Sequence, residues 1–167
     1  MSLWRWTYRL GLLASAPVVF AACASAAGTS PPLATPGSAV GAAPLNQRVV
    51  DLAVESIGSP YKWGGTDANG FDCSGLIQFA YGEFGIDLPR VSTAQIREGW
   101  PVGLSLGQLR PGDILGFSLE SPGETSHVGL YLGENEFIHS SSTGVRVSNL
   151  MNPYWQEHLV AARRIVE

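Results

Sequence analysis

The sequence predicts an α+β domain, because helical patterns fill the first half of the folded region and strand patterns fill the second. Apolar residues recur at helical spacing over residues 46–57 and again over residues 73–84. After Pro111-Gly112 the spacing becomes that of strands. Helices followed by strands predict N-terminal helices packed on a small antiparallel sheet.

Boundary residues support each predicted helix. Asn46 is a candidate N-cap for the first helix, which Gly58 can end. Asp72 can cap the second, which Gly85 can end, and the capping-box pattern Ser92-x-x-Gln95 predicts a short third helix. The residues expected to face the core are Val49, Val50, Ala53 and Ile57 in the first helix, and Leu76, Ile77, Ala80, Tyr81 and Phe84 in the second.

Strand patterns occupy the chain after residue 112. Gly133-Glu134-Asn135 separates two of the strands and predicts a hairpin between them. The predicted strands are Asp113–Phe117, His127–Leu132, Glu136–Ser140, Val145–Ser148 and Leu159–Val166.

The N-terminal segment has the pattern of an export signal. Arg5 and Arg9 precede an apolar run over residues 10–22, which is short for a membrane span and suits a signal-peptide core. The run ends in Phe20-Ala21-Ala22-Cys23, which resembles a lipobox with Cys23 as the lipidated residue. The alternatives are simple cleavage after Ala24-Ser25-Ala26 and a buried helix over the apolar run. We favour the lipoprotein.

Three regions follow from this pattern. Residues 1–23 form the predicted signal peptide, and residues 24–45 are an Ala, Gly, Ser, Thr and Pro-rich stretch that predicts a flexible linker. Residues 46–167 form the predicted catalytic domain. We therefore expect an exported protein that is anchored by lipid and faces the periplasm or cell wall. In a cell with two membranes, Ala24 after the lipobox suggests the outer one.

The charge balance excludes a nucleic-acid-binding class. The net charge is −4, and the region after residue 45 holds eight basic and fourteen acidic residues. No basic stripe interrupts it, whereas binding to phosphate backbones requires one. The sequence leaves the oligomeric state open.

Cys73 is the candidate nucleophile. If Cys23 is lipidated or removed, Cys73 stands alone in an oxidising compartment, where an unpaired thiol is noteworthy. It follows Asp72 at a predicted helix start, and the partial positive charge of a helix N-terminus favours the thiolate. The alternative is a buried structural cysteine.

Two histidines supply the candidate base and its orienting group. His127 begins one predicted strand and His139 ends the next, each six residues from Gly133 at the predicted hairpin centre. They should therefore be cross-strand neighbours on one face, so that one ring faces the thiol and the other fixes its tautomer. The alternatives are structural histidines or a zinc site made with Cys73.

Four ordered motifs surround the candidate site residues. They are Pro60-Tyr61-Lys62-Trp63-Gly64-Gly65, Phe71-Asp72-Cys73-Ser74-Gly75-Leu76, Ser126-His127-Val128-Gly129-Leu130-Tyr131-Leu132-Gly133 and Phe137-Ile138-His139. With these motifs, residues 46–166 resemble the NlpC family of cell-wall cysteine peptidases. Shorter likenesses occur at Leu88–Ser92 and Leu109–Asp113.

The resemblance implies a papain-like fold in which the nucleophile opens a helix packed on the sheet. It implies that Cys73 attacks the carbonyl, that His127 is the base and then the acid, and that His139 orients His127. Thiol chemistry of this kind needs no metal or organic cofactor, so we expect none.

The resemblance also implies substrate contacts. Tyr61 would lie near the thiol and help to stabilise the oxyanion with the backbone amide of Cys73. Asp72 and Ser74 would line the pocket for polar groups of the substrate. Alternatively, Tyr61 anchors its loop, Asp72 only caps the helix and Ser74 is a surface residue.

The implied substrate is the stem peptide of peptidoglycan, which contains D-amino acids and often diaminopimelate. The expected activity is an endopeptidase that cuts a cross-link or a bond within one stem. The alternatives are an amidase or acyltransferase on the same fold, and a non-enzymatic wall-binding protein. The complete set of Tyr61, Cys73, His127 and His139 disfavours the acyltransferase, and the presence of the candidate nucleophile Cys73 disfavours the non-enzymatic protein.

Overall fold

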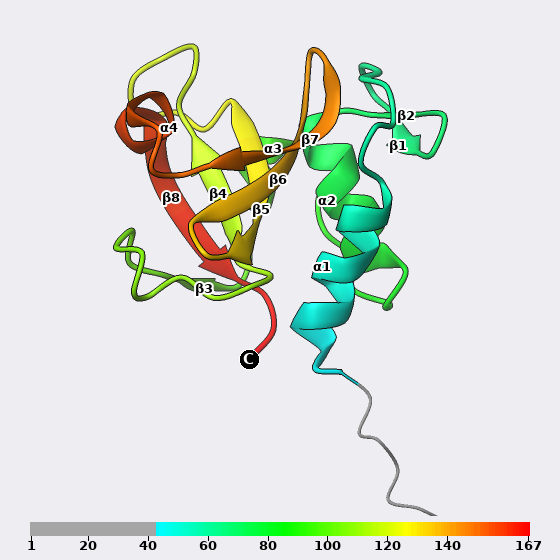
Figure 1. The fold of residues 1–167 in the computed structure, drawn as a ribbon, viewed down its shortest axis with the longest axis horizontal. Coiled ribbons are helices and arrows are strands. Elements are labelled where there is room, and N and C mark those ends of the chain that lie inside the picture. Colours follow the sequence, from blue (N-terminus) through cyan, green and yellow to red (C-terminus); the bar gives the residue numbers. More distant parts are fainter. Residues whose placement is uncertain (1–42) are drawn as a thin grey trace, which may run out of the picture. The chain divides into compact units, whose positions relative to one another are not determined.

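The computed structural model describes residues 43–167 (Figure 1). The predicted signal peptide, its Cys23 and nearly all of the predicted linker lie outside this range. In chain order the elements are α1 (Leu45–Glu55), β1 (Thr66–Asp67), β2 (Gly70–Phe71), α2 (Cys73–Gly82), α3 (Ser92–Gln95), β3 (Trp100–Pro101), β4 (Ile114–Phe117), β5 (His127–Gly133), β6 (Glu136–Ser141), β7 (Gly144–Asn149), α4 (Pro153–His158) and β8 (Leu159–Arg164).

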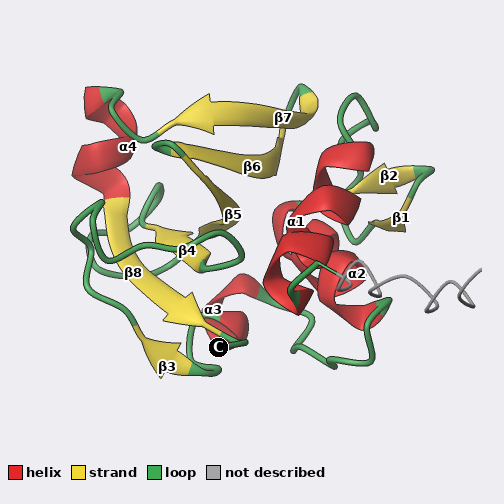
Figure 2. Ribbon diagram, turned by 60° about the horizontal axis from the view of Figure 1, so that its bottom comes forward, coloured by secondary structure: helices red, strands yellow, loops and turns green. Residues whose placement is uncertain are grey.

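A six-stranded antiparallel sheet forms the centre of the domain, in the order β3-β8-β4-β5-β6-β7. Helices α1 and α2 pack on one face, where Leu76 and Ile77 meet Val128 and Leu130. The opposite face carries a second apolar cluster, which includes Trp155 of α4. Figure 2 shows α1 and α2 on one side of the sheet and α4 on the other. The predicted α+β arrangement is confirmed.

Helix α2 matches its prediction closely. Asp72 is the N-cap, and its carboxylate accepts the Gly75 N–H at 2.7 Å. The four expected core residues from Leu76 to Tyr81 are buried, while Phe84 is half-buried beyond the end of the helix. The cap places Cys73 at the first helical position, where its backbone amide is not used by the helix.

Helix α1 is confirmed with two corrections. Its N-cap is Pro44, and the side chain of Asn46 instead donates a hydrogen bond to the Pro111 carbonyl at 3.1 Å. Asn46 therefore links the helical half to the sheet half. The helix also ends at Glu55, so that Ile57 is 49% exposed and not part of the core face.

The capping box predicted for α3 is wrong. The N-cap residue is Val91, and no side chain caps the helix. The Gln95 side chain is fully buried, and its amide donates to the Ser74 and Pro89 carbonyls, both at 2.9 Å. The Gln95 side chain therefore makes tertiary hydrogen bonds instead of a local cap.

The five predicted strands are present as β4 to β8, with ends within one or two residues of the prediction. The hairpin turn is also confirmed: Glu134 and Asn135 both have left-handed backbones, with φ of 51° and 66°, as a two-residue turn of this twist requires. Four elements were not predicted. Strands β1, β2 and β3 have two residues each, and α4 has six, which is too short for periodicity to show.

The register of the β5-β6 hairpin differs from the prediction by two residues. Tyr131 pairs with Phe137, and continuing this register places His139 opposite Gly129, so His127 lies diagonal to His139. A shift of two residues keeps each side chain on its face of the sheet. The two histidines therefore still share one face.

Close contact between α2 and the preceding loop generates a stability prediction. A Cβ atom at Gly75 would lie 1.9 Å from the Gly65 carbonyl oxygen. We expect Gly75→Ala to lower the free energy of unfolding by about 3 kcal/mol, because the backbone must move apart. Urea denaturation measures the change.

Gly82→Ala is the matched control, because Gly82 belongs to the same helix and a Cβ there would meet nothing within 4 Å. It should raise stability by roughly 0.5–1 kcal/mol through lower backbone entropy in the unfolded chain. Equal effects of the two substitutions would contradict the packing argument.

Candidate active site

The Cys73 thiol lies where α2 meets the start of β5. Its side chain is half-buried, and the backbone amides of Val128, Ser74 and Cys73 itself lie close enough to the sulfur to favour its anion. The Val128 amide adjoins His127, the first residue of β5. The thiol and the first predicted histidine are thus brought together from positions 54 residues apart in the chain.

The two histidines form a hydrogen-bonded chain with a third side chain. Nε2 of His127 lies 2.8 Å from Nδ1 of His139, and the ring planes are nearly perpendicular at 88°. Nε2 of His139 lies 2.9 Å from the Ser148 hydroxyl on β7. Nδ1 of His127 makes no side-chain hydrogen bond within residues 43–167, so this nitrogen can accept a proton. Ser148 was not predicted, because a serine in a strand carries no sequence signal.

An aromatic enclosure surrounds both imidazoles. Trp155 stacks near the His127 ring at 6.1 Å between centroids and meets His139 edge-on at 5.0 Å. Phe117 and Phe137 pack against the same group. Burial lowers the pKa of His127 to about 4 and that of His139 to about 3, the latter also through the charges of His127 and Arg146.

The pKa of the Cys73 thiol is shifted upward, whereas the position at a helix N-terminus predicted a downward shift. Burial raises the pKa of Cys73, and the nearby Asp72 carboxylate raises it further, against the opposing effect of the amides. The effect of burial on the thiol pKa is thus larger than the opposing effect of the amides at the helix N-terminus. At neutral pH the resting site holds a neutral thiol and a neutral imidazole. An imidazole in this form can accept a proton, so the site suits a general base.

Asp72 is the centre of a buried polar network. The Arg90 guanidinium donates to its two oxygens at 2.9 and 2.6 Å, and the Gly64 amide donates at 2.9 Å. Burial alone would raise the pKa of Asp72, but Arg90 and the amides of Gly75 and Gly64 lower it below its ordinary value. Arg90 also donates to the Ser74 hydroxyl at 3.0 Å.

Tyr61 lies beside the thiol. Burial raises the pKa of its phenol, and the charges that Cys73 and Asp72 carry when ionised raise it further. The phenol therefore keeps its proton and remains a hydrogen-bond donor. A parallel bridge to Phe71 and a Lys62–Phe71 hydrogen bond of 3.0 Å hold this loop against the nucleophile segment.

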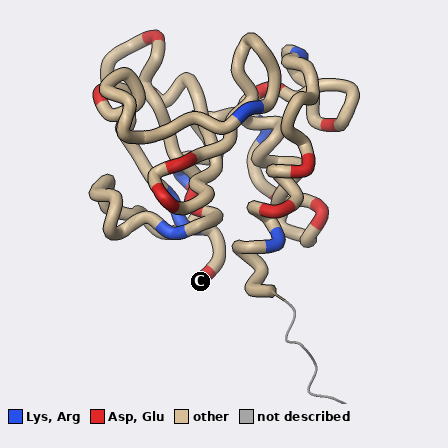
Figure 3. Tube along the Cα trace, in the orientation of Figure 1, with Lys and Arg blue, Asp and Glu red and all other residues tan. Residues whose placement is uncertain are grey.

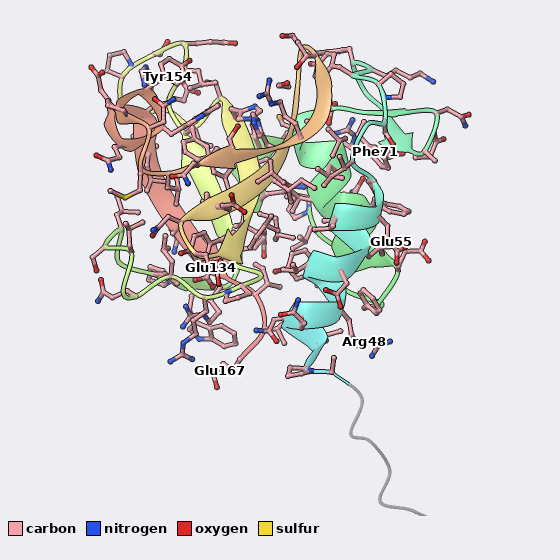
Figure 4. The ribbon with its side chains drawn as sticks, in the orientation of Figure 1. Arg48, Glu55, Phe71, Glu134, Tyr154 and Glu167 are labelled. Atoms are coloured by element: carbon pink, nitrogen blue, oxygen red, sulfur yellow. The ribbon has the colours of Figure 1, made fainter. Side chains whose placement is uncertain are left out.

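A cavity of about 840 Å³ brings four of the predicted residues together. Cys73, His127, His139 and Tyr61 line it, whereas Asp72 and Ser74 do not and are 8% and 5% exposed. Figure 4 shows Phe71 beside the end of α2 that carries Cys73, and Tyr154 on the side of α4. Further lining residues come from Trp63, the β6-β7 loop, the segment 119–120 and α4.

No group of three or more histidine, cysteine or acidic side chains within residues 43–167 is arranged to hold a metal ion. No helix in the same range is both long and apolar enough to cross a bilayer. His158, at the end of α4, lies off the cavity and contacts the Tyr154 carbonyl at 2.7 Å.

A thiol at a helix start, facing two linked imidazoles on an antiparallel sheet, defines a papain-like arrangement. The pattern of the NlpC/P60 family matches residues 58–164. The chain belongs to the NlpC/P60 family. The family resemblance and the papain-like fold predicted from the motifs are thereby confirmed.

Relatives and solved structures agree with this membership. Murein DD-endopeptidase MepH of Escherichia coli K12 is 39% identical over 119 residues, which are 68% of this chain and 43% of MepH. Murein DD-endopeptidase MepS/Murein LD-carboxypeptidase of the same strain is 39% identical over 124 residues, 73% of this chain and 64% of that protein. This chain thus covers less than two thirds of either relative.

A crystal structure of an NlpC/P60 family protein from Bacillus cereus ATCC 10987 has a TM-score of 0.69 and 33% sequence identity. The match covers 74% of this chain and 41% of that one.

The raised thiol pKa predicts a pH dependence of alkylation. Iodoacetamide reacts with the thiolate, so Cys73 in the folded protein should be modified more slowly at neutral pH than in the unfolded chain, and its modification rate should rise at a higher pH than for an unperturbed cysteine. Mass spectrometry of the Cys73 peptide measures the rate separately from that of Cys23.

The control is the same chain in urea, where Cys73 should titrate near the free-cysteine value of about 8.5. Faster modification of the folded protein at pH 6–7 than of the unfolded chain would show instead that a thiolate–imidazolium pair exists at rest.

Proposed function

We propose that this protein is a cysteine-type endopeptidase that hydrolyses peptide bonds in peptidoglycan stem peptides or their cross-links. The single observation that carries the proposal is that Cys73 lines the same cavity as the hydrogen-bonded side chains of His127, His139 and Ser148. Membership of a family with members named murein endopeptidases supports the substrate class.

The first half of the reaction transfers the acyl group to sulfur. Nδ1 of His127 takes the thiol proton while Sγ of Cys73 bonds to the scissile carbonyl carbon. The carbonyl oxygen gains the negative charge and is stabilised by the Cys73 backbone amide and the Tyr61 hydroxyl. His127 then gives its proton to the leaving amine, the C–N bond breaks, and a thioester remains on Cys73.

The second half releases the enzyme. Water enters the cavity, His127 takes one of its protons, and the hydroxide bonds to the thioester carbon. The C–S bond breaks, the carboxylic acid leaves, and the proton returns from His127 to sulfur. A neutral resting imidazole is the form that both base steps require.

If Nδ1 of His127 accepts the proton, the tautomers of both histidines are determined by their hydrogen bonds. His127 must carry its proton on Nε2 and donate it to Nδ1 of His139, which must then act as acceptor. His139 in turn carries its proton on Nε2 and donates it to Ser148. Ser148 is therefore proposed as a positioning residue that selects the active tautomer.

Asp72 and Ser74 act differently from the substrate contacts that the motif suggested. Because both Asp72 oxygens are engaged and neither side chain lines the cavity, we assign them to positioning the nucleophile. The ion pair of Asp72 with Arg90, and the hydrogen bond that Arg90 donates to the Ser74 hydroxyl, hold the Cys73 amide in place for the oxyanion. Tyr61 keeps its proposed contact with the substrate oxyanion.

An amidase is the alternative on the same fold, since the thiol chemistry is identical and only the amide that enters the cavity differs. Whole sacculi distinguish the two enzymes. New peptide termini identify an endopeptidase, whereas intact stems freed from glycan identify an amidase.

Export and lipid anchoring also remain proposals, because the residues that carry them lie outside the described range. The charged start, the apolar run and Cys23 support an exported lipoprotein facing the periplasm or cell wall. Radiolabelled palmitate should enter the wild-type protein and not Cys23→Ser. Equal labelling of both proteins would refute the anchor.

The catalytic assignment is tested by digesting sacculi and measuring the released fragments by mass spectrometry. Cys73→Ala and His127→Ala should each lower the rate of fragment release by about a thousandfold or more, because each removes a bond-making or proton-transferring group.

His158→Ala is the matched control, since it removes a histidine that does not line the cavity and should retain the wild-type rate. Full activity of Cys73→Ala would end the proposal.

The tautomer argument predicts that Ser148→Ala lowers kcat by about tenfold, the worth of one hydrogen bond to a group that becomes charged, with little change in KM. Ser148→Thr keeps the hydroxyl and should restore most of the rate.

Nitrogen NMR of the His139 ring supplies a readout that a purely structural role would not change. In the wild type Nε2 should carry the proton, and in Ser148→Ala the two tautomers should both be populated. An unchanged tautomer together with unchanged kcat would refute the role of Ser148.

A further inference from the structure

Arg146 adjoins the proposed catalytic chain. It lies on β7 directly opposite His139 in the β6-β7 register, and its side chain lines the cavity that holds Cys73. Among the described residues on the cavity wall, Arg146 is the one lysine or arginine, and Glu120 is the one acid. Figure 3 shows the charged residues scattered along the Cα trace of the domain.

The Arg146 guanidinium has no protein partner within residues 43–167. The two ion pairs in this range join Arg90 to Asp72 and Arg164 to Asp113, and no side-chain hydrogen bond there involves Arg146. The residue is exposed to the cavity. Its five donors are therefore available to a ligand.

The position of this charge opposes the reaction in the empty site. Arg146 lies opposite His139, whose pKa its charge lowers, and His139 is hydrogen-bonded to His127. A positive charge formed on His127 is one ring further along this hydrogen-bonded group, and like charges repel. A substrate group of negative charge would cancel this repulsion and also pair with the guanidinium. A carboxylate matches the two parallel donors of arginine in geometry as well as in charge.

We infer that Arg146 binds a free carboxylate of the peptide substrate, so that the enzyme selects stem peptides with an ionised carboxyl close to the scissile bond. The inference rests on the proposed endopeptidase function and deepens it by naming the substrate group that is recognised. The same stem with this carboxyl converted to a carboxamide lacks the charge and half of the acceptors, and is the poorer substrate.

Two matched synthetic stem peptides test the inference, one with a free carboxylate on the residue beside the scissile bond and one with a carboxamide there. The full-length wild-type protein should cut the carboxylate peptide with a kcat/KM roughly tenfold higher, the effect of one charge-assisted hydrogen-bonded pair. In Arg146→Gln this ratio should fall close to one. Arg146→Lys should keep part of it, because lysine retains the charge without the planar fork.

Arg97→Gln is the matched control, since Arg97 is an exposed arginine that does not line the cavity. It should keep the wild-type ratio. Binding of both peptides to the inactive Cys73→Ala protein, with and without Arg146→Gln, gives the same comparison by calorimetry without depending on turnover.

Three outcomes overturn the inference. The first is a wild-type ratio near one. The second is a ratio that Arg146→Gln leaves unchanged. Either of these leaves the endopeptidase proposal intact. The third is failure of the wild-type protein to cut both peptides and to release fragments from sacculi, which overturns the proposed function and this inference with it.

Discussion

The geometry of the site depends on the hydrogen bonds that the Asp72 carboxylate accepts. This carboxylate joins three segments through groups that all bind the same two oxygens: the Tyr61 loop through the Gly64 amide, the start of α2 through the Gly75 amide, and Arg90 after α2. A carboxylate buried in this way would be costly if it were unpaired, and the bidentate guanidinium offsets that cost. As a result, the backbone that carries Cys73, the candidate nucleophile, is held in place. Cys73 lines the cavity, and its helix cap Asp72 does not.

Burial is the second constraint, and it favours the neutral form of each ionisable group among Cys73, His127 and His139. The aromatic enclosure around His127 and His139 keeps both rings neutral, and the half-buried thiol is kept neutral as well. The thiol and the two imidazoles therefore carry no charge at rest and become charged only during the reaction. An environment of this kind makes the oxyanion donors and any charge brought by the substrate more effective than they would be in water.

Much of the fold and the core of the site could be predicted because their signals are local. The α2 cap, the hairpin turn and the period of the strands each occupy a few adjacent residues, and Cys73, His127 and His139 stand within motifs. Trp155, Ser148 and Arg90 gain their roles only from tertiary contacts. Trp155 belongs to a helix too short for periodicity, and Arg90 meets Asp72 across 18 residues of chain. The Gln95 side chain is not a local cap for a related reason: its NH2 group is held by the Ser74 and Pro89 carbonyls outside its own turn, and its amide oxygen accepts no hydrogen bond within the described residues.

The division of the catalytic groups between the two halves of the domain has a consequence for the timing of activity. The thiol comes from the helical half, and the imidazoles come from strands that are synthesised later. A nascent chain that has formed only its first helices holds an ordinary cysteine with no base beside it. The proposed peptide-bond cleavage therefore becomes possible only when the strands have docked on the helices, so that activity is linked to completion of the fold.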